Sequence, residues 1–159
     1  MPDVIVVGGG LTGLMTALTL SHSPYQIAHI QHQQGDGDGE TIRTTTISAA
    51  GRRMLETLGV WQHLTAAPTP IEALKVADGE PSTWIKARRG KAFDLEWQDR
   101  DEPMAFVVPN ATLLRALERQ IRDADVERLT DRTVAGFTTV NKQAHLTLVN
   151  DRRVTDEVI

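Results

Sequence analysis

Hydrophobic and polar positions near the start of the chain predict a strand, a helix and a second strand. Residues 3–7 form an apolar, β-branched run that breaks into glycines, and apolar positions resume over 14–20. The first run is typical of a buried parallel strand and the second of a helix. Pro24 and Tyr25 end the helix, and residues 26–30 read as the next strand. Together these elements predict a β-α-β unit of roughly 30 residues.

The next amphipathic segment predicts a helix over 49–58, with Leu55 and its neighbours on one face. Ser48 is a suitable N-cap and Gly59 a suitable C-cap for this helix. Residues 60–64 predict a short second helix.

Less regular sequence surrounds this helix. Residues 33–39 alternate Asp and Gly and predict a flexible loop. Residues 71–76 predict a strand that ends at an Asp78-Gly79 turn, and residues 80–103 predict short antiparallel strands.

The last part of the chain predicts another helix followed by strands. Residues 104–108 form an apolar strand that Pro109 stops, and Asn110 is expected to cap a helix over 111–123. The apolar stripe of this helix comprises Leu113, Leu114, Leu117 and Ile121. Further strands are expected at 126–129, at 133–140 and 143–149 joined by an Asn141-Lys142 turn, and at 154–159.

The glycines between the first strand and helix carry the clearest chemical signal. Gly8, Gly10 and Gly13 form G-x-G-x-x-G in the strand–helix context that a dinucleotide-binding loop requires. Gly8 permits the tight turn, Gly10 lets a pyrophosphate approach the backbone, and Gly13 lets the helix pack close to the strand. The helix N-terminus offers unpaired N–H groups to the phosphates. A turn that serves only the fold is the alternative.

The ribose partner of such a site stands about 20 residues beyond the glycines, at the end of the second strand. Gln31 occupies that place instead of Asp or Glu. An amide can hydrogen-bond a hydroxyl but lacks the charge of a carboxylate, so Gln31 is either a ribose ligand or a strand-end residue.

Composition narrows the class of protein. The chain has 159 residues, of which 40% are hydrophobic and 24% charged, as in an ordinary globular domain. The net charge of −4 argues against nucleic-acid binding. Cysteine is absent and the five histidines lack metal-ligand spacing, so no metal site is expected, and His29 and His32 are interpreted as structural. No apolar run approaches a membrane span or a cleaved signal, which favours a cytoplasmic protein.

Four stretches, in order, resemble the FAD-dependent aromatic hydroxylases of the para-hydroxybenzoate hydroxylase type, and most closely the ubiquinone-biosynthesis hydroxylases. The first is the glycine motif over 6–18. Residues 43–48 and 54–61 are similar to R-x-x-x-L-S … L-E-x-L-G-x-W, residues 70–79 to P-I … V-x-D, and residues 106–117 to Y-V-V-x-N-x-x-L-R-x-x-L.

The resemblance implies an α/β, Rossmann-like FAD/NAD(P)-binding fold, incomplete, with a small inserted antiparallel β portion. Residues 1–159 would be the N-terminal portion of an FAD-binding domain, with about 70–105 an excursion into the substrate-domain region. The cofactors that the resemblance implies are FAD and, as co-substrate, NAD(P)H. Its implied substrate is a small aromatic ring, a polyprenylated phenol on the way to ubiquinone. Association with the inner membrane, with a biosynthetic complex or as a homo-oligomer is compatible with this family.

The resemblance also assigns roles to individual positions. Those implied to contact FAD are Gly8, Gly10, Leu11, Thr12, Gly13, Gln31, Arg43, Arg115 and Val134. The first five would surround the pyrophosphate. Arg43 would approach the flavin side, Arg115 the pyrophosphate or ribityl chain, and Val134 the adenine through its backbone. From the residues alone, Arg43 could instead be solvated, and Arg115 could form an ion pair with Glu118 one helical turn along.

The family's later G-A-D-G motif does not occur in this sequence, and the only G-D pairs stand in the loop at 35–38, long before the place of the family's second motif. No catalytic residue is therefore predicted. The leading interpretation is the FAD-binding portion of an aromatic hydroxylase. A catalytically inactive nucleotide-binding module is the alternative. An NAD(P)-dependent Rossmann dehydrogenase is disfavoured, because the second strand leads into a long excursion instead of another β-α repeat.

Overall fold

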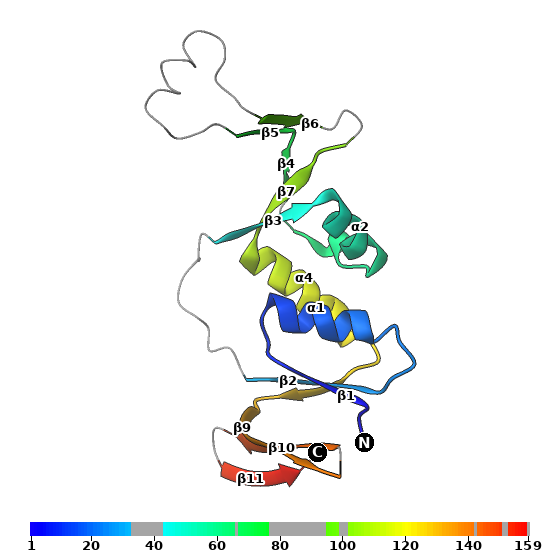
Figure 1. Cartoon of the computed structure of the whole chain (residues 1–159), viewed down its shortest axis with the longest axis vertical. Helices are drawn as coiled ribbons and strands as arrows, with labels where there is room; N and C mark the ends of the chain where they lie inside the picture. Colours follow the sequence, from blue (N-terminus) through cyan, green and yellow to red (C-terminus); the bar gives the residue numbers. More distant parts are fainter. Residues whose placement is uncertain are drawn as a thin grey trace.

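The structure, a computed structural model, describes residues 1–32, 43–65, 67–76, 95–98, 102–141, 143–150 and 153–158. Side chains are described for these residues except 95–98, 150 and 153–158. The molecule is elongated, with a β-ribbon at one end, helices in the middle and β-strands at the other end (Figure 1). The predicted loop at 33–39, the Asp78-Gly79 turn and most of 80–103 lie outside the described residues.

A parallel sheet contains the predicted β-α-β unit. Strand β1 (Val4–Val7) pairs with β2 (Ile27–Gln31), which pairs with β8 (Glu127–Thr130), and both pairings are parallel. Helix α1 (Leu11–Leu20) connects β1 to β2. The prediction of a buried first strand is wrong in one respect. Strand β1 lies at the edge of the described sheet and the side chain of Val7 is 54% exposed, because β2 covers only one of its sides.

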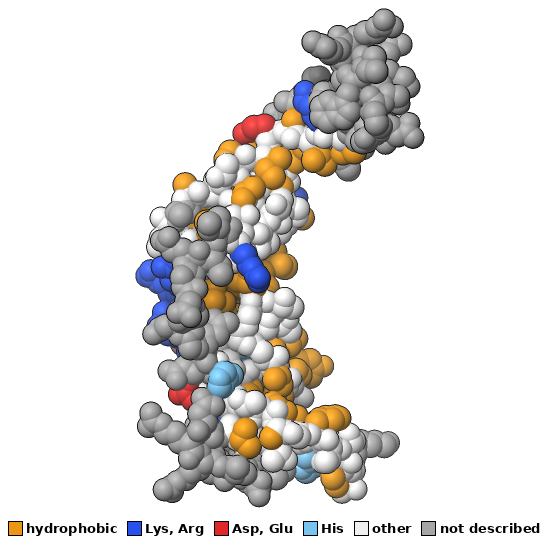
Figure 2. Space-filling model, turned by 90° about the vertical axis from the view of Figure 1, so that its left-hand side faces the viewer, with side chains coloured by type: hydrophobic (Ala, Val, Ile, Leu, Met, Phe, Trp, Pro, Cys, Tyr) orange, Lys and Arg blue, Asp and Glu red, His pale blue; other side chains and the backbone are white. Residues whose placement is uncertain are grey.

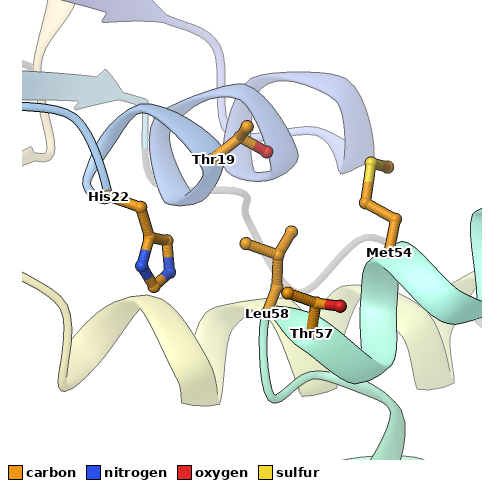
Figure 3. Close-up of a pocket in the computed structure, with 5 residues that line it drawn as sticks. All are labelled: Thr19, His22, Met54, Thr57 and Leu58. Carbon is orange, nitrogen blue, oxygen red and sulfur yellow. The ribbon is translucent and has the colours of Figure 1, made fainter.

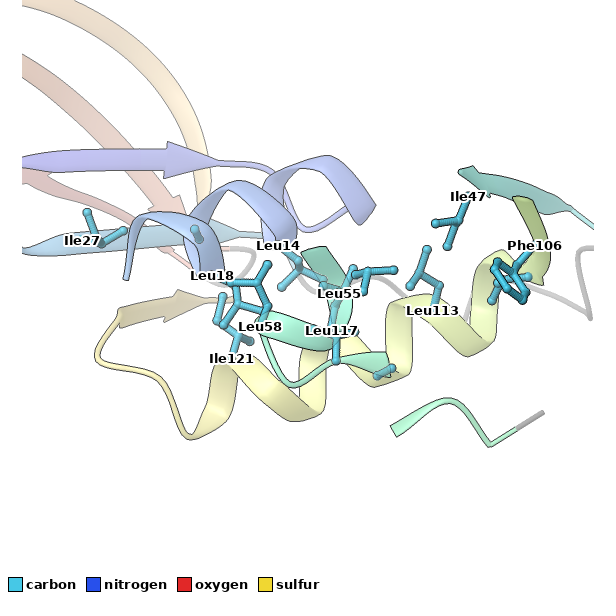
Figure 4. Packing of buried hydrophobic residues seen from close by; sticks show 14 residues of the cluster. Leu14, Leu18, Ile27, Ile47, Leu55, Leu58, Phe106, Leu113, Leu117 and Ile121 are labelled. Carbon is cyan, nitrogen blue, oxygen red and sulfur yellow. The ribbon is translucent and has the colours of Figure 1, made fainter. Parts of the chain in front are cut away.

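Helix α1 packs on α4 (Asn110–Arg122), and both lie on one side of the parallel sheet (Figure 1). Their contact forms the main hydrophobic core (Figure 4). The expected stripe of α4 is largely confirmed, since Leu113, Leu117 and Ile121 are buried and Leu114 is partly buried against them. The other large buried side chains of this core include Leu14, Leu18, Ile27, Leu55, Leu58, Val60 and Val108.

Side chains of β2 alternate between two environments, as expected for a strand covered on both faces. Ile27 belongs to the core that α1 and α4 form. Ile30 instead packs against Leu146 and Leu148 on the opposite face. His29 and Gln31, two and four residues beyond Ile27, therefore share the face on which α1 lies.

Antiparallel strands form the inserted β portion that the resemblance implied. Strands β3 (Thr44–Ser48) and β4 (Thr69–Ile71) flank β7 (Ala105–Pro109) in one sheet. Strand β5 (Ala73–Val76) pairs with β6 (Leu95–Gln98) in a separate ribbon. These pairings confirm antiparallel strands in the described part of the region.

The prediction of one continuous strand over 71–76 is wrong. The structure divides it into β4 and β5, separated by Glu72. Ile71 pairs with Ala105 in the three-stranded sheet of β3, β7 and β4, whereas Ala73 pairs with Gln98 in the β5–β6 ribbon. The chain therefore changes sheets within one continuous extended segment, which hydrophobic alternation cannot reveal.

Helix α2 (Ala49–Thr57) follows β3 directly, and its caps confirm the sequence prediction. The hydroxyl of Ser48 accepts a hydrogen bond from the amide of Gly51 at 3.1 Å. Gly59 has a φ of 72°, and the bonds from Gly59 N to Glu56 O and from Val60 N to Leu55 O close a Schellman motif. The short helix expected next is the single 3₁₀ turn η1, Trp61–His63.

The expected N-cap role of Asn110 is wrong. Asn110 is the first residue of α4, Pro109 occupies the N-cap position, and no side chain caps this end. The side-chain oxygen of Asn110 instead accepts a hydrogen bond from the hydroxyl of Thr45 at 2.6 Å. This bond joins the start of α4 to β3.

The remaining strands form an antiparallel sheet in which β10 (Gln143–Asn150) lies between β9 (Thr133–Val140) and β11 (Arg153–Val158). Asn141, at the predicted turn, has a φ of 51°, while Lys142 lies outside the described residues. No helix among the described residues has the length and apolar character needed to cross a membrane.

Candidate functional site

The turn after β1 depends on glycine at position 8. Gly8 has a φ of 128°, a conformation that side chains with a Cβ rarely adopt. Its amide donates a hydrogen bond to the carbonyl of Ile30 at 2.9 Å. The loop therefore leaves β1 sharply while it remains attached to β2.

Gly13 is required by close packing. A Cβ at this position would lie 1.9 Å from the carbonyl oxygen of Gly8 and 2.8 Å from its carbonyl carbon. Only a glycine lets the first turn of α1 contact the end of β1 this closely. The structural part of the prediction for Gly8 and Gly13 is thus confirmed.

Gly10 has a different environment, because a Cβ here would have no atom within 4 Å. It is the exposed N-cap residue of α1, and its carbonyl accepts the first helical bond, from Leu14, at 3.0 Å. The amides of Leu11, Thr12 and Gly13 have no backbone acceptor within the described part of the chain. No side chain caps this helix end either, so its unpaired N–H groups are free to bind an anion.

Gln31 lies beside the glycine loop, where the sequence placed it. A Cβ added to Gly9 would lie 3.0 Å from Gln31 Cβ and 3.3 Å from Gln31 Oε1. This oxygen is buried and has no hydrogen-bond partner. A buried unpaired acceptor costs roughly 1–3 kcal/mol, so a ligand hydroxyl at this position would relieve that cost.

Arg43 and Arg115 both lie at the start of α4. The carbonyl of Arg43 accepts a hydrogen bond from the amide of Asn110 at 2.9 Å, which holds Arg43 against the first residue of the helix. Arg115 donates from Nε to the carbonyl of Ala111 at 3.1 Å. Both side chains are exposed. The structure therefore places the backbone of Arg43 and the side chain of Arg115 near the first turns of α4. Figure 2 shows blue Lys and Arg side chains along the middle part of the molecule.

Arg115 lies between Leu114 and Leu117, beside the apolar stripe, where an unpaired guanidinium would be costly to bury. In the structure Arg115 is exposed, and the neighbouring positions on α4 are the buried ones. The alternative ion pair with Glu118 is not formed between these two described residues. Nothing in the packing therefore requires an anionic partner for Arg115, and its role depends on the resemblance alone.

A shallow pocket of about 290 Å³ extends from the glycine loop toward β3, α2 and α4. Leu11 contributes from the first turn of α1, and Thr46 and Ser48 from β3 and its end. The sequence did not assign Thr46 a role, although it lies in the segment 43–48 that carries the resemblance. A ligand bound at the α1 N-terminus could extend along this pocket.

A larger hollow of about 410 Å³ lies between α1 and α2 (Figure 3) and shares the Met54 side chain with the shallow pocket. It is lined by Thr19 and His22 at the C-terminal end of α1 and by Met54, Thr57 and Leu58. The glycine loop stands at the opposite end of α1, so this hollow is not part of the candidate site.

Val134 lies on the other face of the parallel sheet from the glycine loop. Its side chain is partly buried against the small cluster that contains Ile30. The neighbouring Thr133 hydroxyl is 3.0 Å from His32 Nδ1, which places the start of β9 at the carboxyl end of β2. The backbone near Val134 is thus close to the end of β2, which is expected to hold the adenosine. The side chain of Val134 packs in the small hydrophobic cluster with Ile30.

His29 contacts the glycine loop, which the sequence interpretation missed. Its side chain is fully buried, and Nε2 is 2.8 Å from the carbonyl oxygen of Gly8. A lone polar residue within an apolar strand, two positions before Gln31 on the same face, was the available signal. Within the described residues, no three His, Asp or Glu side chains gather in a way that could hold a metal ion.

Comparison with curated proteins finds ubiquinone hydroxylases. The chain is 28% identical over 118 residues to the ubiquinone hydroxylase UbiL of Rhodospirillum rubrum, covering 72% of this chain and 26% of the relative. It is 26% identical over 168 residues to the ubiquinone hydroxylase UbiM of Neisseria meningitidis, covering 99% of this chain and 34% of the relative. The chain thus spans between a quarter and about a third of the length of these relatives.

Comparison with solved structures finds the same fold in flavin-dependent enzymes. PqsL of Pseudomonas aeruginosa in complex with 2-aminobenzoylacetate superposes with a TM-score of 0.67 at 19% identity, covering 99% of this chain and 40% of that one. The flavin-dependent monooxygenase PieE in complex with FAD and substrate gives 0.66 at 16% identity, covering 99% and 29%. At such identities these likenesses establish the fold alone.

The family described as FAD binding domain matches residues 1–157, almost the whole chain. This match agrees with the β-α-β unit, with the glycine loop and with the hydroxylase resemblance drawn from the sequence. The chain therefore belongs to the FAD binding domain family.

Proposed function

We propose that this chain binds the adenosine diphosphate half of FAD in an NAD(P)H-dependent monooxygenase that hydroxylates an aromatic ubiquinone precursor. The observation that carries the proposal is the N-terminus of α1. There, unpaired amides from Leu11 to Gly13 adjoin Gly10, whose missing side chain leaves open space. A diphosphate matches both properties, since it is anionic and needs close approach to the backbone.

The other candidate residues fit the same ligand. Gln31 has an unpaired buried oxygen beside Gly9, which can accept a hydrogen bond from a ribose hydroxyl. The shallow pocket next to Leu11 continues toward the end of β3, where Thr46 and Ser48 line it, and could hold the next part of the cofactor. The exposed guanidinium groups of Arg43 and Arg115 supply positive charge at the start of α4.

When bound, FAD supplies the redox chemistry: NAD(P)H reduces it, and its reaction with O₂ delivers one oxygen atom to an electron-rich ring. The residues of this chain contribute binding and orientation. Unpaired helix amides hold the diphosphate, Gln31 orients the ribose, and the apolar packing beneath α1 keeps the loop rigid. The described residues provide no assigned proton donor or acceptor for the ring chemistry.

A polyprenylated phenol is the proposed substrate because the relatives of this chain named above are ubiquinone hydroxylases. A small aromatic substrate is also consistent with PqsL, whose structure contains 2-aminobenzoylacetate.

A catalytically inactive nucleotide-binding module is the second candidate. It is favoured by the unpaired groups at the glycine loop, the amides of Leu11 to Gly13 and Gln31 Oε1, which match a diphosphate and a ribose.

The experiment is a titration of the purified chain with FAD, FMN and ADP, followed by flavin fluorescence and by competition. We expect FAD to bind, FMN to bind far more weakly because it lacks the ADP half, and ADP to compete with FAD. Equal binding of FMN and FAD would refute the role of the glycine loop. ADP binding as tight as FAD binding would favour the nucleotide-binding module without flavin contacts.

A further inference from the structure

His29 is the one fully buried histidine among the described residues, and it lies in the middle of β2. Its Nε2 is 2.8 Å from the carbonyl oxygen of Gly8. A carbonyl oxygen can only accept a hydrogen bond, so Nε2 must carry the proton. In the neutral imidazole Nδ1 is then the unprotonated nitrogen, and this atom is buried without a hydrogen-bond partner.

Both backbone polar groups of Gly8 are held by adjacent residues of β2. The amide donates to Ile30 O at 2.9 Å, and the carbonyl accepts from His29. On the remaining side of the carbonyl lies Gly13, where an added Cβ would be only 1.9 Å away. The peptide that follows Gly8 is thus held between β2 and the first turn of α1.

The orientation of this peptide determines where the next amide points. In a planar trans peptide, the C=O of one residue and the N–H of the next point in opposite directions. The carbonyl of Gly8 is directed toward His29, into the protein. The N–H of Gly9 is therefore directed away from β2, toward the space in front of the glycine loop.

An imidazole is an unusual choice for this position. Leaving Nδ1 buried and unpaired costs roughly 1–3 kcal/mol, a cost that a leucine of similar size would avoid. Leucine would instead leave the carbonyl of Gly8 without the donor that holds it, at a cost of similar size. The presence of a histidine at this position is therefore explained by its hydrogen bond to the carbonyl of Gly8.

We propose that His29 is a positioning residue that fixes the Gly8–Gly9 peptide so that the Gly9 amide is preorganised to donate to the cofactor diphosphate. This inference depends on the proposed function for its ligand, but the hydrogen bond and the peptide orientation can be tested without any cofactor. His29 acts through Gly8 and does not itself contact the diphosphate.

The test compares His29→Leu, His29→Gln and Ile27→Val in the full chain. His29→Leu keeps the volume but removes the donor, and His29→Gln restores an N–H of comparable reach. Ile27→Val is the matched control, since Ile27 lies on the same face of β2 and does not contact Gly8. We expect His29→Leu to weaken FAD binding by about tenfold, His29→Gln to recover most of the affinity, and Ile27→Val to bind FAD as the wild type does.

NMR of the cofactor-free protein provides the second readout. Nitrogen-15 spectra of the imidazole should show the proton on Nε2, and His29→Leu should shift the amide resonance of Gly9. A proton on Nδ1, an unmoved Gly9 amide, or wild-type FAD affinity in His29→Leu would overturn the proposal. If His29→Leu does not fold, the proposal is still tested by the tautomer of His29 in the wild-type protein and by the FAD titration of His29→Gln. A wild type that binds no FAD would refute the proposed function, while the NMR result independently decides whether the hydrogen bond positions the loop.

Discussion

Replacing Gly13 by alanine should damage the loop in a way that the structure quantifies. The new Cβ would lie 1.9 Å from Gly8 O, whereas contacts of a Cβ shorter than 3.0 Å essentially do not occur. The two backbone segments would have to separate by about 1.1 Å, the difference between these distances. Neither atom belongs to a flexible side chain, so no rotamer change can absorb the movement.

The movement would act on two hydrogen bonds, one from His29 to Gly8 O at 2.8 Å and one from Leu14 to Gly10 O at 3.0 Å. Overpacking typically costs about 1–3 kcal/mol, and losing one of these bonds adds about 1 kcal/mol. Alanine recovers at most about 1 kcal/mol because it favours the helix more than glycine does. We therefore expect Gly13→Ala to lower the free energy of unfolding by about 2 kcal/mol and to abolish tight FAD binding.

Gly10→Ala is the matched control, because it adds the same methyl group three residues away. It would meet no atom within 4 Å, and the φ of −79° at Gly10 suits any residue. The free energy of unfolding should change by less than about 1 kcal/mol, the cost of a poorer N-cap. FAD affinity should nevertheless fall strongly, because the methyl group fills the space proposed for the diphosphate.

The assay is urea unfolding followed by circular dichroism, run in parallel with a flavin fluorescence titration of each variant. The prediction separates the two measurements: Gly13→Ala loses stability and binding, and Gly10→Ala loses binding alone. Wild-type stability in Gly13→Ala would refute the packing argument. Wild-type affinity in Gly10→Ala would refute the position assigned to the diphosphate.

Three further substitutions test other parts of the structure. Gln31→Glu should tighten FAD binding several-fold in the same titration, because a carboxylate accepts a stronger hydrogen bond from a ribose hydroxyl than an amide does; weaker binding would contradict the ribose role. Ser48→Ala removes the bond to Gly51 and should lower the free energy of unfolding by about 1 kcal/mol in urea; an unchanged midpoint would show that the cap contributes nothing. Leu117→Ala, at 1% exposure between α1 and α4, should cost about 2–5 kcal/mol, and a loss below 1 kcal/mol would contradict the position of the core.

The parts of the fold that local sequence determines were predictable. The β-α-β unit follows from apolar periodicity on either side of the glycines, and α2 from Ser48 and Gly59 at its ends. The division of 71–76 into β4 and β5 was not predictable, because pairing with Ala105 or with Gln98 is a long-range choice. A strand's alternation looks the same whichever neighbour it joins.

The candidate site shows the same limit. The motif spacing placed Gln31 at the end of β2, and there it adjoins Gly9 of the loop, because a short β-α-β segment fixes this distance; the cofactor contacts of Gly10 and Gln31 stay predictions. The exposure of Arg115 was missed, because one step of about 100° around the helix separates a solvated position from a buried one. The contact of His29 with Gly8 was missed because the two residues are 21 positions apart and meet only when β1 and β2 pair.

The strand order of the parallel sheet has a consequence for how the protein is made. Strands β1 and β2 and the helix between them are complete by Gln31, whereas β8 does not begin until Glu127. On a ribosome, the hydrogen bonds of Gly8 with the His29 side chain and the Ile30 carbonyl can form as soon as the first strands emerge, while α1 must wait for α4 to cover its apolar side. During that interval Leu14 and Leu18 face water, so the nascent chain should be most dependent on chaperones before residue 122 emerges.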